Sequence, residues 1–255
     1  MKKSGVFFID YSIIKISYVI DGGFSNFFLL LCELMFTKLN FLKKRIKRLT
    51  GFGYLLQMVP FAKAVILTGS MAFGAAKPAS DIDLLIVVRP KRLYTARFFA
   101  TIWNAFTGHR RKPFEKNVVG KFCINHFMTT ENFTILPHTE ANARAHRFMV
   151  KVWDREGEHE RLMRENFWMR KYQLSPADVD QLEFIQSGFP LEKPVFFAVF
   201  RRIWEWILAG KFGDLVEGRL AKWQKDKIAS GMGQLDSTSE IYISDTDLRL
   251  WGREF

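Results

Sequence analysis

The chain has 255 residues, 48% of them hydrophobic and 25% charged, and its formal net charge is +12. This length and composition can bury a sizeable core, while two widely separated cysteines and five scattered histidines exclude a disulfide scaffold and argue against a histidine-bound zinc. The thiols are expected to be reduced, which predicts a cytoplasmic protein, and the positive charge favours polyanionic partners: nucleotides, RNA or an anionic membrane surface.

Residues 1–50 are predicted to form an N-terminal extension that leads into a basic amphipathic helix. The apolar run 24–36 is too short to span a bilayer, so no integral membrane segment is expected. Apolar residues then recur at helical spacing from Leu39 to Leu49 with Lys and Arg between them, and this helix is expected to end near Gly51. Such a helix usually packs on a sheet, although its basic face could also bind RNA or a membrane surface.

The most informative motif lies in the second predicted region, residues 51–137. A short apolar strand, 64–67, ends at Thr68-Gly69-Ser70, where backbone N–H groups and a hydroxyl can face an anion. A second strand starts with Asp81-Ile-Asp83 and continues as an apolar run, so alternation places both carboxylates on one face. Two carboxylates in this arrangement can share divalent cations that also hold a triphosphate.

This Gly-Ser turn followed after a gap by Asp-x-Asp between hydrophobic residues resembles the signature of the polymerase-β-like nucleotidyltransferase superfamily. The chain looks closest to small, stand-alone predicted bacterial nucleotidyltransferases, and the likeness covers roughly residues 60–255. Three further stretches carry it: Arg92–Arg97, Cys123–Phe127 and Glu165–Trp168. The resemblance implies an α+β fold, with a nucleotidyltransferase-type mixed β-sheet, flanking helices and a helical C-terminal region. It also implies transfer of a nucleoside monophosphate (NMP) from a nucleoside triphosphate (NTP) to an acceptor that it does not identify.

On this basis residues 51–137 are the predicted catalytic domain, with Mg²⁺ or Mn²⁺ as cofactor. Asp81 and Asp83 are the predicted metal ligands, and the glycine of the turn permits close backbone approach to the β- and γ-phosphates. The predicted nucleotide-binding residues are Gly69, Ser70, Ser80, Arg92 and Arg97. The alternative is that ordinary surface carboxylates cap the start of a strand, and that the arginines belong to a solvated basic face.

Basic residues gather at 38–48 and again at 89–97 with 109–112, and the second group could flank the site because it follows the Asp strand. Pro90 opens a predicted helix that extends to Phe106.

The next strand, 118–128, raises the question of a third carboxylate, which the superfamily usually places in this part of the chain. The best-placed polar residue here is Asn125, a predicted catalytic residue whose amide oxygen can coordinate a metal but brings no charge and cannot act as a general base. Glu131 could substitute only if the chain curls back, and His126 is more often a satisfied core histidine than a base.

The third predicted region, residues 138–255, is mostly helical. Apolar and aromatic residues recur at helical spacing in four segments: 141–153, 158–171, 194–208 and 215–229. Their aromatic residues are expected to form the core and the helix seams: Phe148, Trp153, Phe167, Trp168, Trp204, Trp206 and Trp223. The tail 240–251 is a predicted strand or hairpin, in which Asp245-Thr-Asp247 is interpreted as a turn or helix cap.

Three functions therefore stay open from the sequence. The first is an active nucleotidyltransferase that uses an NTP and modifies RNA, a small molecule or a protein. The second is a catalytically weak or inactive nucleotide-binding pseudoenzyme, because the third carboxylate is replaced by Asn125. The third is a module that binds RNA or a membrane surface through its basic residues and ignores nucleotides.

Overall fold

The computed structural model describes residues 26–112, 115, 117–188, 195–232 and 240–251. The chain divides into two units, Met1–Asn40 and Phe41–Phe255. Helix α1 (Asn26–Leu56) begins in the first unit and continues into the second. The predicted extension up to residue 25 lies outside the described residues, and the sheet and the other helices belong to the second unit.

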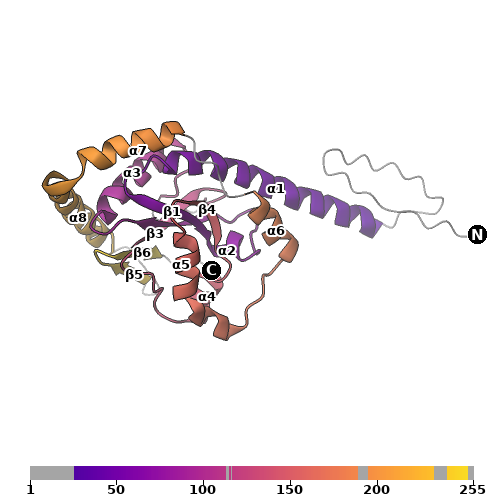
Figure 1. Ribbon diagram of the computed structural model, residues 1–255. Coiled ribbons are helices and arrows are strands. Elements are labelled where there is room, and N and C mark those ends of the chain that lie inside the picture. The colour runs from indigo at the N-terminus through magenta and orange to yellow at the C-terminus, as the bar shows by residue number, and fades with distance from the viewer. Residues whose placement is uncertain (1–25, 113–114, 116, 189–194, 233–239, 252–255) are drawn as a thin grey trace, which may run out of the picture. The chain divides into compact units, whose positions relative to one another are not determined.

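A six-stranded mixed sheet forms the centre of this unit, in the order β4-β1-β2-β3-β6-β5 (Figure 1). The strands are β1 (Ala62–Thr68), β2 (Ile82–Val88), β3 (Phe122–Thr129), β4 (Val150–Asp154), β5 (Glu240–Ile243) and β6 (Asp247–Trp251). Only β2 and β3 pair in parallel; every other neighbouring pair is antiparallel. A parallel pair needs a crossover connection, and α3 (Leu93–Phe106) supplies it.

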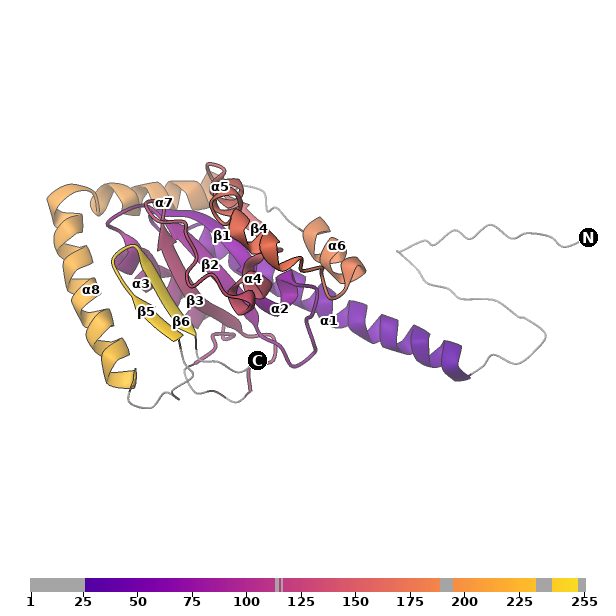
Figure 2. The same ribbon diagram turned by 90° about the horizontal axis from the view of Figure 1, so that it is seen from below.

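The remaining helices flank the sheet and make up much of the C-terminal half. They are α2 (Gly69–Ala72), α4 (Glu140–His146), α5 (Glu158–Glu165), the 3-10 helix η1 (Phe167–Tyr172), α6 (Val179–Ser187), α7 (Val195–Ile207) and α8 (Gly210–Met232). Both ribbon views show α8 beside α3 (Figures 1 and 2), where the Glu217 carboxylate accepts hydrogen bonds from the first two N–H groups after Leu93. No helix among the described residues combines the length and the apolar character that crossing a membrane requires.

Two apolar clusters cover the two faces of the sheet. On β2, Ile82, Leu84, Ile86 and Val88 pack with residues of α1 and α3, whereas Leu85 and Val87 pack with residues of α4, α5 and η1. This is the period-2 alternation of a strand buried on both sides. The alternation assigns Asp83, and Asp81 just before the strand, to the same face as Leu85.

Several predicted elements need correction. The segment 141–153 is not one helix, because α4 ends at His146 and the chain continues as β4, which pairs with β1. The β-branched and aromatic residues of β4 suit a strand, and β4 pairs with the backbone groups at the edge of β1. The local sequence pattern does not show that this edge needs a partner. The segment 158–171 divides into α5 and η1, and α6 was not predicted. Helix α1 passes through Gly51, where nothing lies near the missing side chain, and ends at Leu56.

The aromatic residues of the C-terminal half are only partly core. Trp153 is 1% exposed and packs against the first apolar cluster. In contrast, Trp206 is 80% exposed and Phe167 61%, so the prediction that these two rings belong to the core or a helix seam is wrong. Trp223 is half-exposed but packs edge-on against Phe98 of α3, at a seam between helices. Helical spacing identifies a face, but it does not show whether another element covers that face.

Candidate functional site

Asp81 and Asp83 lie where β2 begins, at the middle of the sheet. Asp83 pairs with Thr68 of β1 on one side and with Cys123 of β3 on the other. Both carboxylates lie on the same face of the sheet as Leu85 and Val87, but at the N-terminal end of β2. At this end polar side chains replace the apolar cluster. The sheet therefore holds two partly buried carboxylates on one face, as the alternation predicts.

Gly69 brings the predicted turn directly against Asp83. Its φ of +68° is in the left-handed region, and a Cβ at this position would overlap the Oδ2 atom of Asp83. Only glycine meets both conditions without strain or a shift of the carboxylate. Ser70 follows in α2 and is partly buried, so the structure brings the Gly-Ser turn and the Asp-x-Asp motif together.

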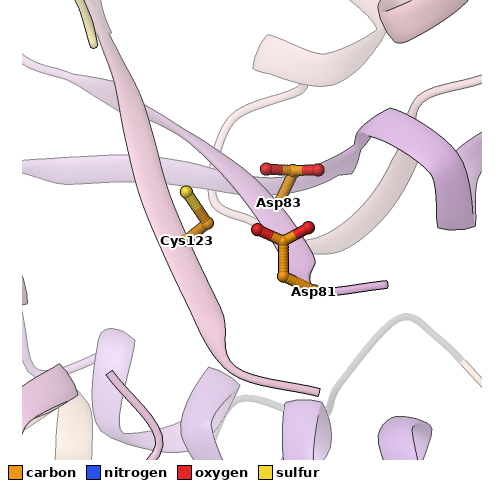
Figure 3. A group of neighbouring side chains, drawn as sticks. All are labelled: Asp81, Asp83 and Cys123. Carbon is orange, nitrogen blue, oxygen red and sulfur yellow. The ribbon is translucent and has the colours of Figure 1, made fainter. Parts of the chain in front are cut away.

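Cys123 occupies the third corner beside the two aspartates (Figure 3). Its Sγ and one oxygen from each of Asp81 and Asp83 all lie within 4.8 Å of one another. Among the residues that the structure describes, this is the one group of His, Cys, Asp or Glu side chains gathered closely enough for a single metal ion. Cys123 is a free thiol that is only partly buried.

Asn125 lies two residues after Cys123 on β3, at an irregularity in the pairing with β2. The register passes from Leu84 opposite Ile124 to Leu85 opposite His126, so Asn125 is the extra residue of a β-bulge. Its Nδ2 atom is 3.5 Å from Oδ1 of Asp83. The structure thus brings Asn125 to Asp83, while the position opposite Asp83 belongs to Cys123.

A guanidinium that was not singled out in the sequence faces the carboxylates. Arg111 Nη1 lies 2.6 Å from Asp81 Oδ2 and 4.0 Å from Cys123 Sγ. The backbone holds it there, because the segment after α3 bonds to the start of β3 through Phe122 N–H to His109 O and Arg111 N–H to Phe122 O. The sequence signal was the basic group 109–112, without an indication of which residue turns inward.

A second unexpected arginine fixes the loop before Asp81. Arg45 of α1 is buried and donates from Nη2 to the carbonyl oxygens of Pro78, at 2.9 Å, and Ser80, at 2.5 Å. The Ser80 carbonyl also accepts from Gly120 N–H, while the Ser80 hydroxyl accepts from Lys77 N–H. Ser80 therefore shapes the turn that presents Asp81. Arg45 stands at helical spacing between buried Leu42 and Leu49, which is the pattern that could have revealed its burial.

Burial and like charge give the site an unusual electrostatic balance. Burial, together with the neighbouring Asp81, raises the pKa of Asp83 to about 7, and Arg111 opposes this shift. Burial and the two carboxylates also raise the pKa of the Cys123 thiol well above its ordinary value. Arg111 pairs directly with Asp81, and the charge of Arg45 also acts on Asp81, yet the pKa of Asp83 stays raised. The ionised form of Asp83 would therefore gain from a further cation.

Arg92 and Arg97 are not brought to the carboxylates. Arg92 follows the opposite end of β2, is buried, and pairs with Asp214 of α8 at 2.7 Å. Arg97 donates to the Gln224 side chain of α8 at 2.5 Å, and burial with nearby Arg110 lowers its pKa to about 10. In this structure both arginines attach α3 and its preceding turn to α8.

The candidate base His126 and the candidate substitute carboxylate Glu131 also lie elsewhere. His126 is buried, and its Nε2 lies 3.1 Å from Oδ1 of Asp247. Glu131 is exposed and follows the C-terminal end of β3, whereas Asp81 precedes the N-terminal end of the parallel strand β2. Asp247, taken from the sequence as part of a turn, is instead the buried first residue of β6, whereas Asp245 lies in the turn.

Comparison with protein families matches the chain to a family described as "Nucleotidyltransferase domain", over residues 52–196. This range contains the Gly-Ser turn, both aspartates, Arg111 and Cys123. Searches of curated proteins and of solved structures gave no match.

Proposed function

We infer the activity from the family: the chain belongs to the nucleotidyltransferase domain family, and we propose that it transfers a nucleoside monophosphate from an NTP to an acceptor. The observation that carries this proposal is the packing of Gly69 against Asp83, which sets a turn suited to phosphate beside two paired carboxylates. Both the positive φ of Gly69 and its close approach to Asp83 require a glycine. Such a glycine is expected where the backbone must approach a ligand closely.

The donor atoms fit a divalent cation. Asp81 and Asp83 offer carboxylate oxygens, the ligands that suit Mg²⁺ and Mn²⁺, and the ionised form of Asp83 gains from a cation. A cation held there would offset the charge of the triphosphate and increase the electrophilicity of the α-phosphorus.

The chain's own residues supply the remaining parts of the site. In this proposal the backbone at Gly69 and the Ser70 hydroxyl hold the β- and γ-phosphates. Arg45 donates to the Ser80 carbonyl and so supports the turn before Asp81. Arg111 provides a fixed positive charge beside Asp81, where it can stabilise charge that builds up during transfer. Asn125 orients Asp83 and carries no charge.

The acceptor class stays a three-way proposal: RNA, a small molecule or a protein. The net charge of +12 supports contact with a polyanion, and such binding must weaken as salt rises because phosphate contacts release counterions. A nucleotide-binding pseudoenzyme is the second candidate function. It is favoured by the third corner of the site, which holds a thiol instead of a carboxylate, and by Arg111, which already compensates Asp81.

Label transfer tests the proposal directly. The full chain is incubated with each NTP labelled at the α-phosphate, with Mg²⁺ or Mn²⁺ and a cell extract. We expect a labelled acceptor product, and we expect Asp81→Asn and Asp83→Asn each to reduce it about a thousandfold, which corresponds to several kcal/mol of lost stabilisation.

Asp245→Asn is the matched control, because it removes an aspartate from another Asp-x-Asp sequence of the chain, in an exposed turn. This variant should keep full transfer. Binding of metal–NTP by calorimetry without transfer to any acceptor would instead support the pseudoenzyme. Equal label transfer by wild type and Asp83→Asn would contradict the assignment of the catalytic site to these aspartates.

A further inference from the structure

Cys123 stands where its sulfur, rather than a third oxygen, meets the two aspartates. The parallel register of β2 and β3 pairs Cys123 with Asp83, and the β-bulge at Asn125 follows only after this pair. The cysteine position is therefore fixed by backbone pairing on the strand next to the motif. It does not depend on the conformation of a loop.

The surroundings of Cys123 differ from those of an ordinary core cysteine. A buried free cysteine usually behaves as a small hydrophobic side chain among apolar neighbours. Here Sγ lies within 4.8 Å of both carboxylates and 4.0 Å from the Arg111 guanidinium, and the residue is only partly buried. The sulfur thus faces the polar end of the sheet.

The spacing of the three donors suits one ion. Zn²⁺ binds thiolate sulfur at about 2.3 Å and carboxylate oxygen at about 2.0–2.2 Å in tetrahedral geometry, so two ligands of one ion lie about 3.3–3.7 Å apart. Sγ and the two oxygens lie within 4.8 Å of one another, so the three side chains have to move together by about 1 Å to bind the same ion.

Resting on the proposed function, we propose that Cys123 is the third protein ligand of the cation at Asp81 and Asp83, and that its sulfur shifts the preference of the site from Mg²⁺ towards Mn²⁺, Co²⁺ and Zn²⁺. Carboxylates alone suit Mg²⁺, whereas a thiolate is a soft ligand that Mg²⁺ binds poorly and that Co²⁺ and Zn²⁺ bind well. One sulfur in a set of two carboxylates gives a mixed site that favours the later divalent ions of the first transition series.

Cobalt spectroscopy tests the ligand without any need for an acceptor. Metal-free full-length protein is titrated with Co²⁺ alone, and we expect a sulfur-to-cobalt charge-transfer band in the near ultraviolet that saturates at one equivalent. Zn²⁺ at stoichiometric amounts should abolish this band, and excess Mg²⁺ should not. Cys123→Ser should remove the band and weaken Co²⁺ and Zn²⁺ binding by at least about 10- to 100-fold, the loss typical of removing a residue that only supports a ligand.

Cys32→Ser is the matched control, because Cys32 is the chain's other cysteine and lies far from Cys123 in sequence. This variant should keep the band. Cys123→Asp provides a second, charged replacement at the same position, and it should lose the band while it gains affinity for Mg²⁺. Circular dichroism of each variant verifies that loss of the band does not come from loss of the fold.

The outcomes separate this inference from the proposed function. Absence of the band in wild type, or its persistence in Cys123→Ser, overturns Cys123 as a ligand, even if label transfer with Mg²⁺ proceeds normally. A Cys123-dependent band in a chain that transfers no nucleotide establishes the metal ligand and counts against the enzymatic function instead.

Discussion

Two polar clusters lie along β3, and they compensate their charges in different ways. At the start of the strand, Asp81 and Asp83 have Cys123 beside them; Arg111 pairs directly with Asp81, and the charge of Arg45 also acts on Asp81. Further along the strand, one carboxylate, Asp247, faces two potential cations: His126 Nε2 at 3.1 Å and Arg249 Nη2 at 2.9 Å. The first cluster is partly buried, whereas the second is almost fully enclosed.

The difference shows how a binding site can be distinguished from a structural network of similar composition. In the enclosed cluster each charge has a partner, so a ligand would have to displace an existing interaction. In the open cluster the direct ion pair of Arg111 is with Asp81, and the pKa of Asp83 rises to about 7 because of burial and Asp81. A free-energy cost that a cation can relieve is the property expected of a binding site.

The largest expected effect comes from breaking the enclosed cluster. Asp247→Asn leaves the Arg249 guanidinium buried without its counter-charge and weakens the contact with His126. Loss of one partner of a buried ion pair typically costs about 3–5 kcal/mol, and we expect a decrease of this size in the free energy of unfolding, measured with urea.

Asp245→Asn serves as the control, because the Asp245 side chain is 79% exposed and pairs with Lys225 on the surface. Its effect should be below about 1 kcal/mol. Similar losses for the two substitutions would mean that the enclosed cluster is not a fixed part of the fold.

A smaller effect should appear in the pH dependence of stability. Burial first, and then the neighbouring His126, lowers the pKa of His146 to about 3, while its Nδ1 donates to the Asn142 carbonyl; Arg249 and Asp247 also face it. Unfolded His146 takes up a proton below about pH 6.5, but the folded form stays neutral. Stability is therefore complete above this pH and decreases as pH falls towards 3.

Each proton bound only by the unfolded chain contributes a slope of about 1.4 kcal/mol per pH unit. We expect the free energy of unfolding in urea to decrease between pH 7 and pH 5 in the wild type. In His146→Gln this decrease should be smaller, by the contribution of about one proton. Parallel stability profiles for the two proteins would contradict a neutral, enclosed histidine.

The sequence predicted the elements whose pattern is local, and it missed those that depend on a partner. Strands β1 and β2, helix α3 and the β5–β6 hairpin follow from alternation, helical spacing and turn residues. In contrast, β4 exists because β1 has a free edge, and the burial of Arg45 depends on the carbonyl groups of a distant loop. Helical spacing places Arg45 on the buried face of α1, but the partners of Arg45 and of β4 leave no local signal in the chain.

The same limit applies to the site. The Gly-Ser turn and both aspartates could be located from residue types and spacing. Which residue of β3 stands beside them depends on strand register, and alternation alone gives Cys123 and Asn125 the same face. The register places Cys123 opposite Asp83, and the bulge gives Asn125 a separate position. Arg111 is selected from its basic neighbours by backbone bonds to Phe122, which no local pattern encodes.

The smallest expected effect is an increase in the free energy of unfolding, whereas Asp247→Asn decreases it. This difference in sign is the sharpest test of the comparison between the two clusters. Asp83→Asn removes one of two facing negative charges from a partly buried position next to Gly69. Because the folded-state pKa of Asp83 is raised from 3.8 to about 7, ionised Asp83 opposes folding, and this cost appears as pH rises through the interval from about 4 to about 7. We therefore expect the metal-free variant to be more stable than wild type at pH 8, by on the order of 1 kcal/mol, and to match it near pH 4. Thermal unfolding in the presence of a chelator measures this difference, and added Mn²⁺ should reverse it, because a cation stabilises only the carboxylate form. Asp247→Asn should destabilise at both pH values, so a loss of stability in both variants would mean that the two clusters are held together in the same way and that the carboxylates at β2 are structural.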